Sequence, residues 1–118
     1  MSELVDQLLY QMRSAGLPEP QTEVRFHQRR RWRFDICWPA MMLAVEVDGG
    51  NWVWGRHVRA RAYEGDCEKQ AEAVIEGWRY VRVTGDMVCD GRALRIIERL
   101  LQAECRTGSK KGWSKDEF

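Results

Sequence analysis

The sequence predicts an α/β domain with a mixed four-stranded sheet flanked by helices and a further helix at the C-terminal end. Three observations support this fold class. Apolar residues recur at helical spacing in residues 2–16, apolar and polar residues alternate in residues 23–48, and a second helical segment precedes another alternating run. Because a strand that follows a helix usually joins its sheet parallel to a neighbour, one strand pair is expected to be parallel.

The first predicted helix lies within residues 2–16. Ser2 is a typical N-cap residue, Gly16 is a typical C-terminal stop, and the prolines at positions 18 and 20 prevent continuation. One face of this helix is apolar and is expected to pack on the core; its residues are Leu4, Val5, Leu8, Leu9 and Met12.

Three strands are predicted next. The first begins at Glu23 and is separated from the second by a polar tip at residues 28–31. The second strand ends at Pro39, and strict alternation should place its apolar side chains on one face: Trp32, Phe34, Ile36 and Trp38. The third strand covers residues 42–48. It should direct Leu43, Val45 and Val47 to one face of the sheet and Ala44, Glu46 and Asp48 to the other.

A second helix is predicted over residues 59–76, after a loop that starts with Gly49 and Gly50. Its apolar side, which should pack against the sheet, is expected to comprise Tyr63, Cys67, Ala71, Val74 and Ile75.

The C-terminal third is predicted to contain a fourth strand over residues 78–83 and a last helix that begins near residue 90. We expect a single domain over residues 1–105 and a flexible basic tail over residues 106–118.

The net charge of +1 gives the whole molecule no attraction to nucleic acid. Arginines nevertheless cluster around the polar tip, and such clusters can bind phosphate, although a solvated surface is their commoner role. The cysteines are widely spaced without a CxxC pair, which disfavours a zinc site and indicates free thiols in a reducing cytoplasm. No apolar run approaches the length of a membrane span.

Acidic residues interrupt two otherwise apolar strands. Asp35 lies in the second strand, and Glu46 and Asp48 project from the same face of the third. In an antiparallel pair Asp35 can lie opposite or diagonal to Glu46, and carboxylates grouped in this way need a cation. The spacing leaves two interpretations equally open. One is a site for a hard divalent ion such as Mg²⁺ or Mn²⁺, and the other is a set of ion pairs with arginines on a solvated sheet face.

Other candidates depend on weaker signals. Lys69 and Asp66 share a helical face, which suits a cation beside a metal-bound water or an ordinary surface ion pair. Glu23 would add an acid to the same site, although its position at a strand start favours a surface role. His57 is a candidate base or metal ligand, although a lone loop histidine is more often neither. Candidates for DNA contact are Arg29, Arg30, Arg31, Arg56, Arg59, Trp52 and Trp54.

Several pieces occur in order between residues 23 and 88, namely Asp35, "AVEVDGG", His57, "DCEK" and "GWRYVRVT". Together they resemble the PD-(D/E)XK superfamily with its restriction-endonuclease-like αβββαβ core, and in particular small phage-type and very-short-patch-repair-like endonuclease domains. The resemblance implies that Asp35, Glu46 and the main-chain carbonyl of Val47 bind metal.

One position departs from the family pattern. Asp48 stands where a typical member has lysine, so the resemblance implies that Lys69, from the following helix, takes over that role. Asp48 would then bind metal or hold His57.

The function implied by the resemblance is that of an endonuclease that uses Mg²⁺ or Mn²⁺ to hydrolyse DNA, with branched or structured DNA as substrate, as for Holliday-junction resolvases. Such enzymes commonly act as homodimers, and the expected location is the cytoplasm of a bacterial or phage-infected cell. The missing motif lysine keeps a second function open, a catalytically inactive nucleic-acid-binding module on the same fold. A third is an interaction protein whose acids pair with arginine.

Overall fold

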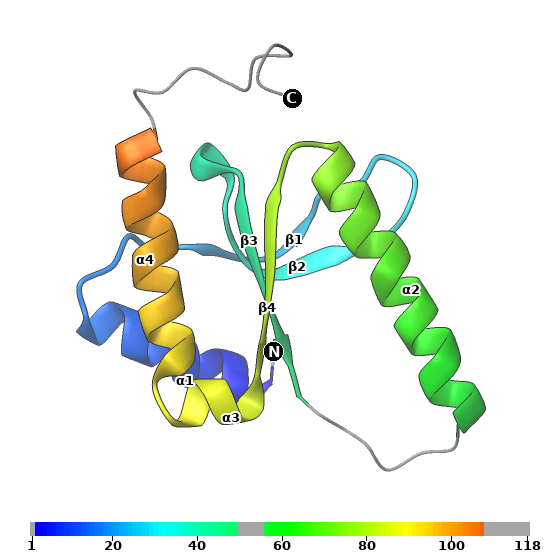
Figure 1. The fold of residues 1–118 in the computed structure, drawn as a ribbon, viewed down its shortest axis with the longest axis horizontal. Helices are drawn as coiled ribbons and strands as arrows, with labels where there is room; N and C mark the ends of the chain where they lie inside the picture. Colours follow the sequence, from blue (N-terminus) through cyan, green and yellow to red (C-terminus); the bar gives the residue numbers. More distant parts are fainter. Residues whose placement is uncertain (1, 50–55, 108–118) are drawn as a thin grey trace, which may run out of the picture.

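The computed structural model describes the backbone of residues 2–49 and 56–107 and the side chains of residues 2–49 and 63–103. Its elements, shown in Figure 1, are α1 (Glu3–Ser14), β1 (Gln21–Arg25), β2 (Arg33–Trp38), the 3-10 helix η1 (Pro39–Met41), β3 (Leu43–Asp48), α2 (Arg56–Ile75), β4 (Arg79–Thr84), α3 (Gly85–Cys89) and α4 (Arg92–Thr107).

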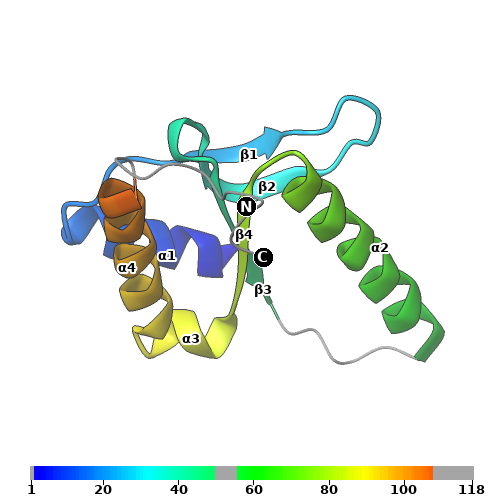
Figure 2. The same cartoon turned by 45° about the horizontal axis from the view of Figure 1, so that its top comes forward.

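The strands form one sheet in the order β1-β2-β3-β4. β1 pairs antiparallel with β2, β2 pairs antiparallel with β3, and β3 pairs parallel with β4. The helices α1, α3 and α4 lie on one side of this sheet, and α2 lies on the other (Figure 1 and Figure 2). The predicted fold class, an α/β domain with a mixed four-stranded sheet flanked by helices and a C-terminal helix, is confirmed.

The larger hydrophobic core lies between the sheet and the helices α1, α3 and α4. The α1 residues that point into it match the predicted apolar face, and Ser2 caps the helix by accepting a hydrogen bond from the Val5 N–H at 3.2 Å. Residues buried in this core include Leu8, Met12, Ile36, Leu43, Val45, Val83, Val88 and Ile97.

A smaller cluster, Phe34, Cys37, Ala44 and Ala73, lies on the side of the sheet that faces α2. The prediction that the apolar residues of β2 share one face was wrong, because Phe34 belongs to this cluster whereas Ile36 and Trp38 belong to the larger core. The alternation changes at Asp35. The facing residue of β1 is Glu23, whose left-handed φ of 53° interrupts the β1–β2 ladder, and such an irregularity re-aims the side chains around it.

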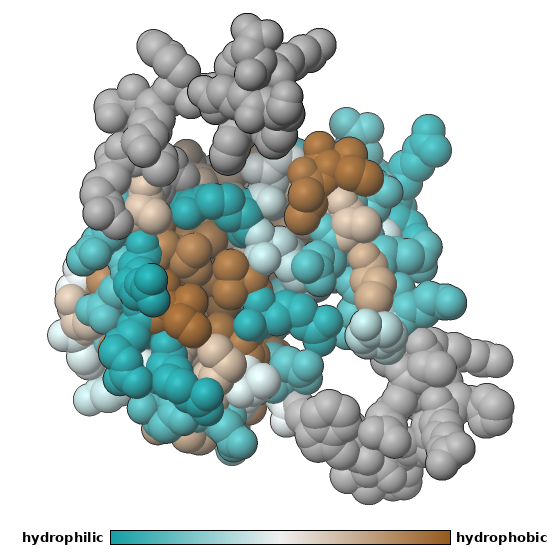
Figure 3. All heavy atoms as spheres, in the orientation of Figure 1, coloured by the Kyte–Doolittle hydropathy of each residue, from teal (hydrophilic) through white to brown (hydrophobic). Residues whose placement is uncertain are grey.

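The prediction for the buried side of α2 was also wrong. The residues that were expected to face the sheet are all exposed, namely Tyr63, Cys67, Ala71, Val74 and Ile75. Figure 3 shows the resulting apolar surface over the C-terminal end of α2. The helix instead turns Asp66, Lys69 and the buried Ala73 toward the sheet. This inner face is polar because it covers the carboxylates of β3.

The boundaries of α2 also differ from the prediction. The helix starts at Arg56, so the backbone of His57 lies in its first turn and not in a loop. At the other end, Gly77 has φ of 99° and follows the end of the helix, since glycine adopts this left-handed conformation without strain.

Helix α3 was not predicted. It begins after Thr84, whose Oγ1 accepts a hydrogen bond from the Met87 N–H at 3.2 Å. The following helix, α4, continues to Thr107, so the start of the predicted tail is helical. Residues 108–118 lie outside the described part of the chain. Within the part that is described, we find no helix of the length and apolarity that a membrane span requires.

Candidate active site

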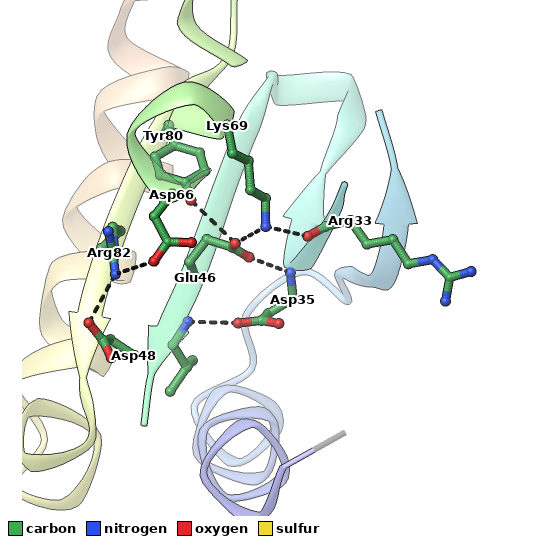
Figure 4. A network of polar contacts seen from close by, with 9 residues as sticks. Arg33, Asp35, Glu46, Asp48, Asp66, Lys69, Tyr80 and Arg82 are labelled. Atoms are coloured by element: carbon green, nitrogen blue, oxygen red, sulfur yellow. Dashed lines mark hydrogen bonds and ion pairs between the residues drawn. The ribbon is translucent and has the colours of Figure 1, made fainter. Parts of the chain in front are cut away.

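Two acidic side chains connect β2 and β3 at the point where regular pairing between these strands stops. The last pair of the ladder is Ile36–Val45. Beyond it, the Asp35 N–H donates to Glu46 Oε2 at 2.7 Å, and the Val47 N–H donates to Asp35 Oδ2 at 2.9 Å (Figure 4). Each carboxylate is therefore oriented by the backbone of the opposite strand through a charge-assisted hydrogen bond.

Glu46 lies at the centre of this group, and its side chain is only 13% exposed. Its Oε1 forms an ion pair with the ammonium group of Lys69 from α2 and accepts a hydrogen bond from the Tyr80 hydroxyl at 3.2 Å (Figure 4). The Lys69 ammonium also donates to the main-chain carbonyl of Arg33 at 2.6 Å. Lys69 thus connects α2 to both β2 and β3.

The surroundings of Glu46 change the acidity of two groups. Burial raises the pKa of Glu46 above its ordinary value, and this effect exceeds the opposing influence of the Lys69 hydrogen bond and charge. Burial, followed by the charge of Glu46, also raises the pKa of Tyr80, so its hydroxyl remains protonated and donates. A carboxylate that is desolvated to this extent needs a cation or a proton to offset its charge.

A second charged group lies beside the first. The Arg82 guanidinium on β4 donates to Asp48 of β3 at 3.0 Å and to Asp66 of α2 at 3.4 Å. The parallel register places Arg82 beside Glu46, which brings the two groups together. They share a cleft of about 160 Å³, which is lined by Asp35, Glu46, Val47, Asp48, Gly49, Asp66, Tyr80 and Arg82.

This cleft offers oxygen ligands of the kind that a hard divalent ion uses. Mg²⁺ is typically held by one or two carboxylates and keeps several waters, and both Asp35 and Glu46 line the cleft. Among the described groups, none donates a hydrogen bond to Asp35 Oδ1. The described residues contain no cluster of three or more His, Cys, Asp or Glu arranged around a metal position. Asp35 and Glu46 therefore fit an ion that has few protein ligands and keeps several waters. Glu46 would then contact both the ion and the Lys69 ammonium.

Four of the other predicted site residues are described by the structure and do not line the cleft. Glu23 is exposed and does not line the cleft. The exposed side chains of Arg29, Arg30 and Arg31 lie in the loop between β1 and β2 and do not line the cleft either. The structure does not describe the side chains of the remaining candidates, which are Trp52, Trp54, Arg56, His57 and Arg59.

Two residues of the site, Tyr80 and Arg82, were not predicted. They occupy alternate positions of β4, and the intervening Val81 packs on the opposite side of the sheet in the larger core. This alternation is visible in the sequence, but it indicates the site only once β4 is known to lie beside β3. Asp66 and Lys69 share the inner face of α2, but each has its own partner. Asp66 pairs with Arg82, and Lys69 pairs with Glu46.

Comparison with known proteins bears on the fold. No family model and no curated protein matches the sequence. The structure is similar to the catalytic domain of the homing endonuclease I-Bth0305I, with a TM-score of 0.63 and 17% sequence identity over 88% of this chain and 98% of that chain. At this level of identity, the likeness establishes a shared fold.

Proposed function

We propose that this protein is a metal-dependent endonuclease that hydrolyses DNA phosphodiester bonds at the cleft between α2 and the sheet. The observation that carries the proposal is the convergence of Asp35, Glu46 and Lys69, from three separate elements, on one largely buried carboxylate site. Buried ion pairs seldom stabilise a fold more than apolar residues of similar volume, so such a site favours a functional explanation. The fold supports the proposal, because the similar structure is named as the catalytic domain of an endonuclease.

Asp35, Glu46 and the main-chain carbonyl of Val47 are the proposed ligands of Mg²⁺ or Mn²⁺. When bound, the ion would polarise the scissile phosphate and lower the pKa of a coordinated water. The protein fixes both carboxylates in advance, through the hydrogen bonds from the opposite strand and from the Tyr80 hydroxyl. Ligands oriented before the substrate binds need no reorganisation during the reaction.

Lys69 is proposed to replace the family lysine that is absent at position 48. Its ammonium is held between Glu46 and the Arg33 carbonyl, next to the proposed ligands. A fixed cation there would orient the attacking water and stabilise negative charge that develops on the phosphate. Asp48, which is held by Arg82, is proposed as a further acid at the same cleft.

The finer assignments belong to the same proposal. They are membership of the PD-(D/E)XK superfamily, a branched or structured DNA substrate, and action as a homodimer that brings two sites to two strands. The arginines at positions 29–31 would position the DNA backbone from the β1–β2 loop, because phosphate contacts fix register and orientation.

A second candidate function is a catalytically inactive nucleic-acid-binding module. One observation favours it: Lys69 neutralises Glu46, and Arg82 bridges Asp48 and Asp66, so these acids already have cationic partners within the protein. Such a module would bind DNA in a salt-dependent manner, because its contacts release counterions, and added metal would not lead to cleavage.

The test is cleavage of supercoiled plasmid and of a labelled four-way junction in Mn²⁺, Mg²⁺ or EDTA. The wild type is compared with Glu46→Gln and with Glu64→Gln, a matched control on the exposed side of α2. We expect metal-dependent cleavage by the wild type and the control, and a loss of about 10²–10³-fold in Glu46→Gln. Binding without cleavage in any metal would favour the inactive module. Cleavage by Glu46→Gln at the wild-type rate would place the active site elsewhere.

A further inference from the structure

A second concave surface lies between the β1–β2 loop and α2. It encloses about 610 Å³, within the range of small-molecule pockets, and its residues differ from those of the carboxylate cleft. Its two walls have opposite character. The loop contributes a basic and aromatic wall with Arg29, Arg30 and Trp32, and α2 contributes an acidic wall with Glu68, Glu72 and Glu76. We call this surface the loop groove.

The loop wall is held in place by His27. Its Nδ1 accepts hydrogen bonds from the backbone N–H of Arg29 at 3.2 Å and of Arg30 at 2.9 Å. Since Nδ1 is an acceptor, the ring proton is on Nε2, which faces Glu72 Oε1 at 3.1 Å. His27 therefore connects the arginine-bearing loop to α2, and the groove between them is formed before any ligand binds.

Trp32 provides a rigid flat surface within the loop groove. Its ring is nearly parallel to that of Phe26, at 14° and 6.3 Å between centroids, and Phe26 in turn stacks on the buried Phe34 at 4.1 Å. A planar cation covers the Trp32 ring, because the guanidinium carbon of the exposed Arg30 lies 4.0 Å from the ring centroid. A planar ligand would take the place of this guanidinium at little cost, since Arg30 is free to turn toward solvent.

We propose that the loop groove binds an unpaired nucleobase of the DNA, an inference that rests on the proposed function. The acidic wall repels phosphate, so the DNA backbone does not fill the groove. A nucleobase is flat and uncharged: it would stack on Trp32, and its exocyclic amine would donate to a carboxylate such as that of Glu72. Arg29 at the rim would contact a flanking phosphate, whereas the same arginines would repel a basic peptide.

The loop groove adjoins the carboxylate site. Arg33, whose carbonyl accepts from the Lys69 ammonium, directly follows Trp32 in the chain. On α2, Glu68 precedes Lys69 and Glu72 follows it within one helical turn, which is about 5.4 Å along the helix. A base held in the groove would therefore belong to a nucleotide close to the scissile phosphate. The preferred substrate is DNA with an unpaired nucleotide next to the cut.

The test measures binding in EDTA, where metal-dependent cleavage does not interfere. Fluorescence anisotropy is recorded with three labelled duplexes of one sequence: fully paired, with one unpaired adenine, and with an abasic residue in place of that adenine. The abasic duplex keeps the extra backbone but lacks the base. We expect the wild type to bind the adenine duplex about tenfold more tightly than the abasic duplex, because base–aromatic stacking contributes this much. Equal affinities for these two duplexes would overturn the proposal.

The matched variants are Trp32→Ala and Trp32→Phe, each checked by thermal melting. Trp32→Ala should bring the tenfold ratio close to one, and Trp32→Phe should keep most of it, because a phenyl ring still stacks. A folded Trp32→Ala protein with the full ratio would overturn the proposal. If Trp32→Ala does not fold, the comparison of adenine and abasic duplexes with the wild type decides alone. Absence of binding to all three duplexes would refute the proposed function as well, whereas tight and equal binding would refute only this inference.

Discussion

The contact between Lys69 and Glu46 makes a quantitative prediction. Lys69→Met keeps the apolar stem of the side chain but removes the ammonium that pairs with Glu46 and bonds to the Arg33 carbonyl. The Lys69 and Glu46 side chains are only 12% and 13% exposed, so the variant would leave a carboxylate poorly solvated and without its cation. Breaking a buried pair from one side costs about 3–5 kcal/mol of unfolding free energy. We expect the lower end of this range, because Tyr80 still donates to Glu46.

The loss of stability should depend on pH. Burial raises the pKa of Glu46 and Lys69 opposes this rise, so Lys69→Met should raise the pKa further. An acid with a higher pKa in the folded than in the unfolded protein binds protons more tightly when folded. Its contribution to stability is full below the unfolded value of 4.5 and is lost as the pH rises through the folded pKa. The variant should therefore regain stability, relative to wild type, when the pH falls from 7 toward 5.

Urea unfolding at pH 7 and pH 5 measures both effects. The control is the double variant Lys69→Met/Glu46→Gln, which leaves no unpaired charge and should recover most of the lost free energy. Suppose instead that Lys69→Met is as stable as wild type at pH 7 and shows the same pH dependence. The ion pair would then be absent in solution, and the argument that Lys69 belongs to the site would lose its main support.

Three further predictions concern the α2 side of the sheet. Tyr80→Phe should lower the unfolding free energy in urea by about 0.5–1.5 kcal/mol through loss of the hydrogen bond to Glu46, and an unchanged value would contradict that bond. Phe34→Ala should lower it by about 3–5 kcal/mol, because the side chain is fully buried, and a negligible loss would mean that the cluster is loosely packed. Burial raises the pKa of Cys37 to about 11, so iodoacetamide at pH 8 should label the exposed Cys67 much faster than Cys37 in the folded protein. Peptide mass spectrometry would detect the difference, and equal labelling would argue against the burial of Cys37.

Much of the fold could be predicted from the sequence because local rules determine it. Helix α1 has a complete set of signals, from the Ser2 cap to the stop at Gly16, and its predicted face is the one that is buried. The mixed sheet could be predicted because a helix precedes the fourth strand, and such a strand usually lies parallel to a neighbour. These features depend on residues that are close in the chain, so no knowledge of the tertiary arrangement was needed.

The features that were wrongly predicted or missed depend on contacts between distant segments of the chain. The alternation of β2 breaks at Asp35 because Glu23, on another strand, has a left-handed backbone. Tyr80 joins the site because β4 lies parallel to β3, an order of strands that the sequence pattern does not specify. The carboxylates themselves were identifiable, since a charged residue within an apolar strand needs a partner, but the identity of that partner was not.

The two faces of the sheet have different roles, and this difference explains why α2 was misjudged. Helices α1, α3 and α4 bury large apolar side chains, as a stable domain of this size requires. Among the described residues of α2, Ala73 is the buried one, and the helix otherwise contacts the sheet through charged groups such as Lys69 and Asp66. An apolar inner face on α2 would have packed better, but it would have left Glu46 without a cation. The position of α2 is therefore coupled to the charge of the cleft, and a metal ion that competes for Glu46 would also act on the contacts that hold this helix.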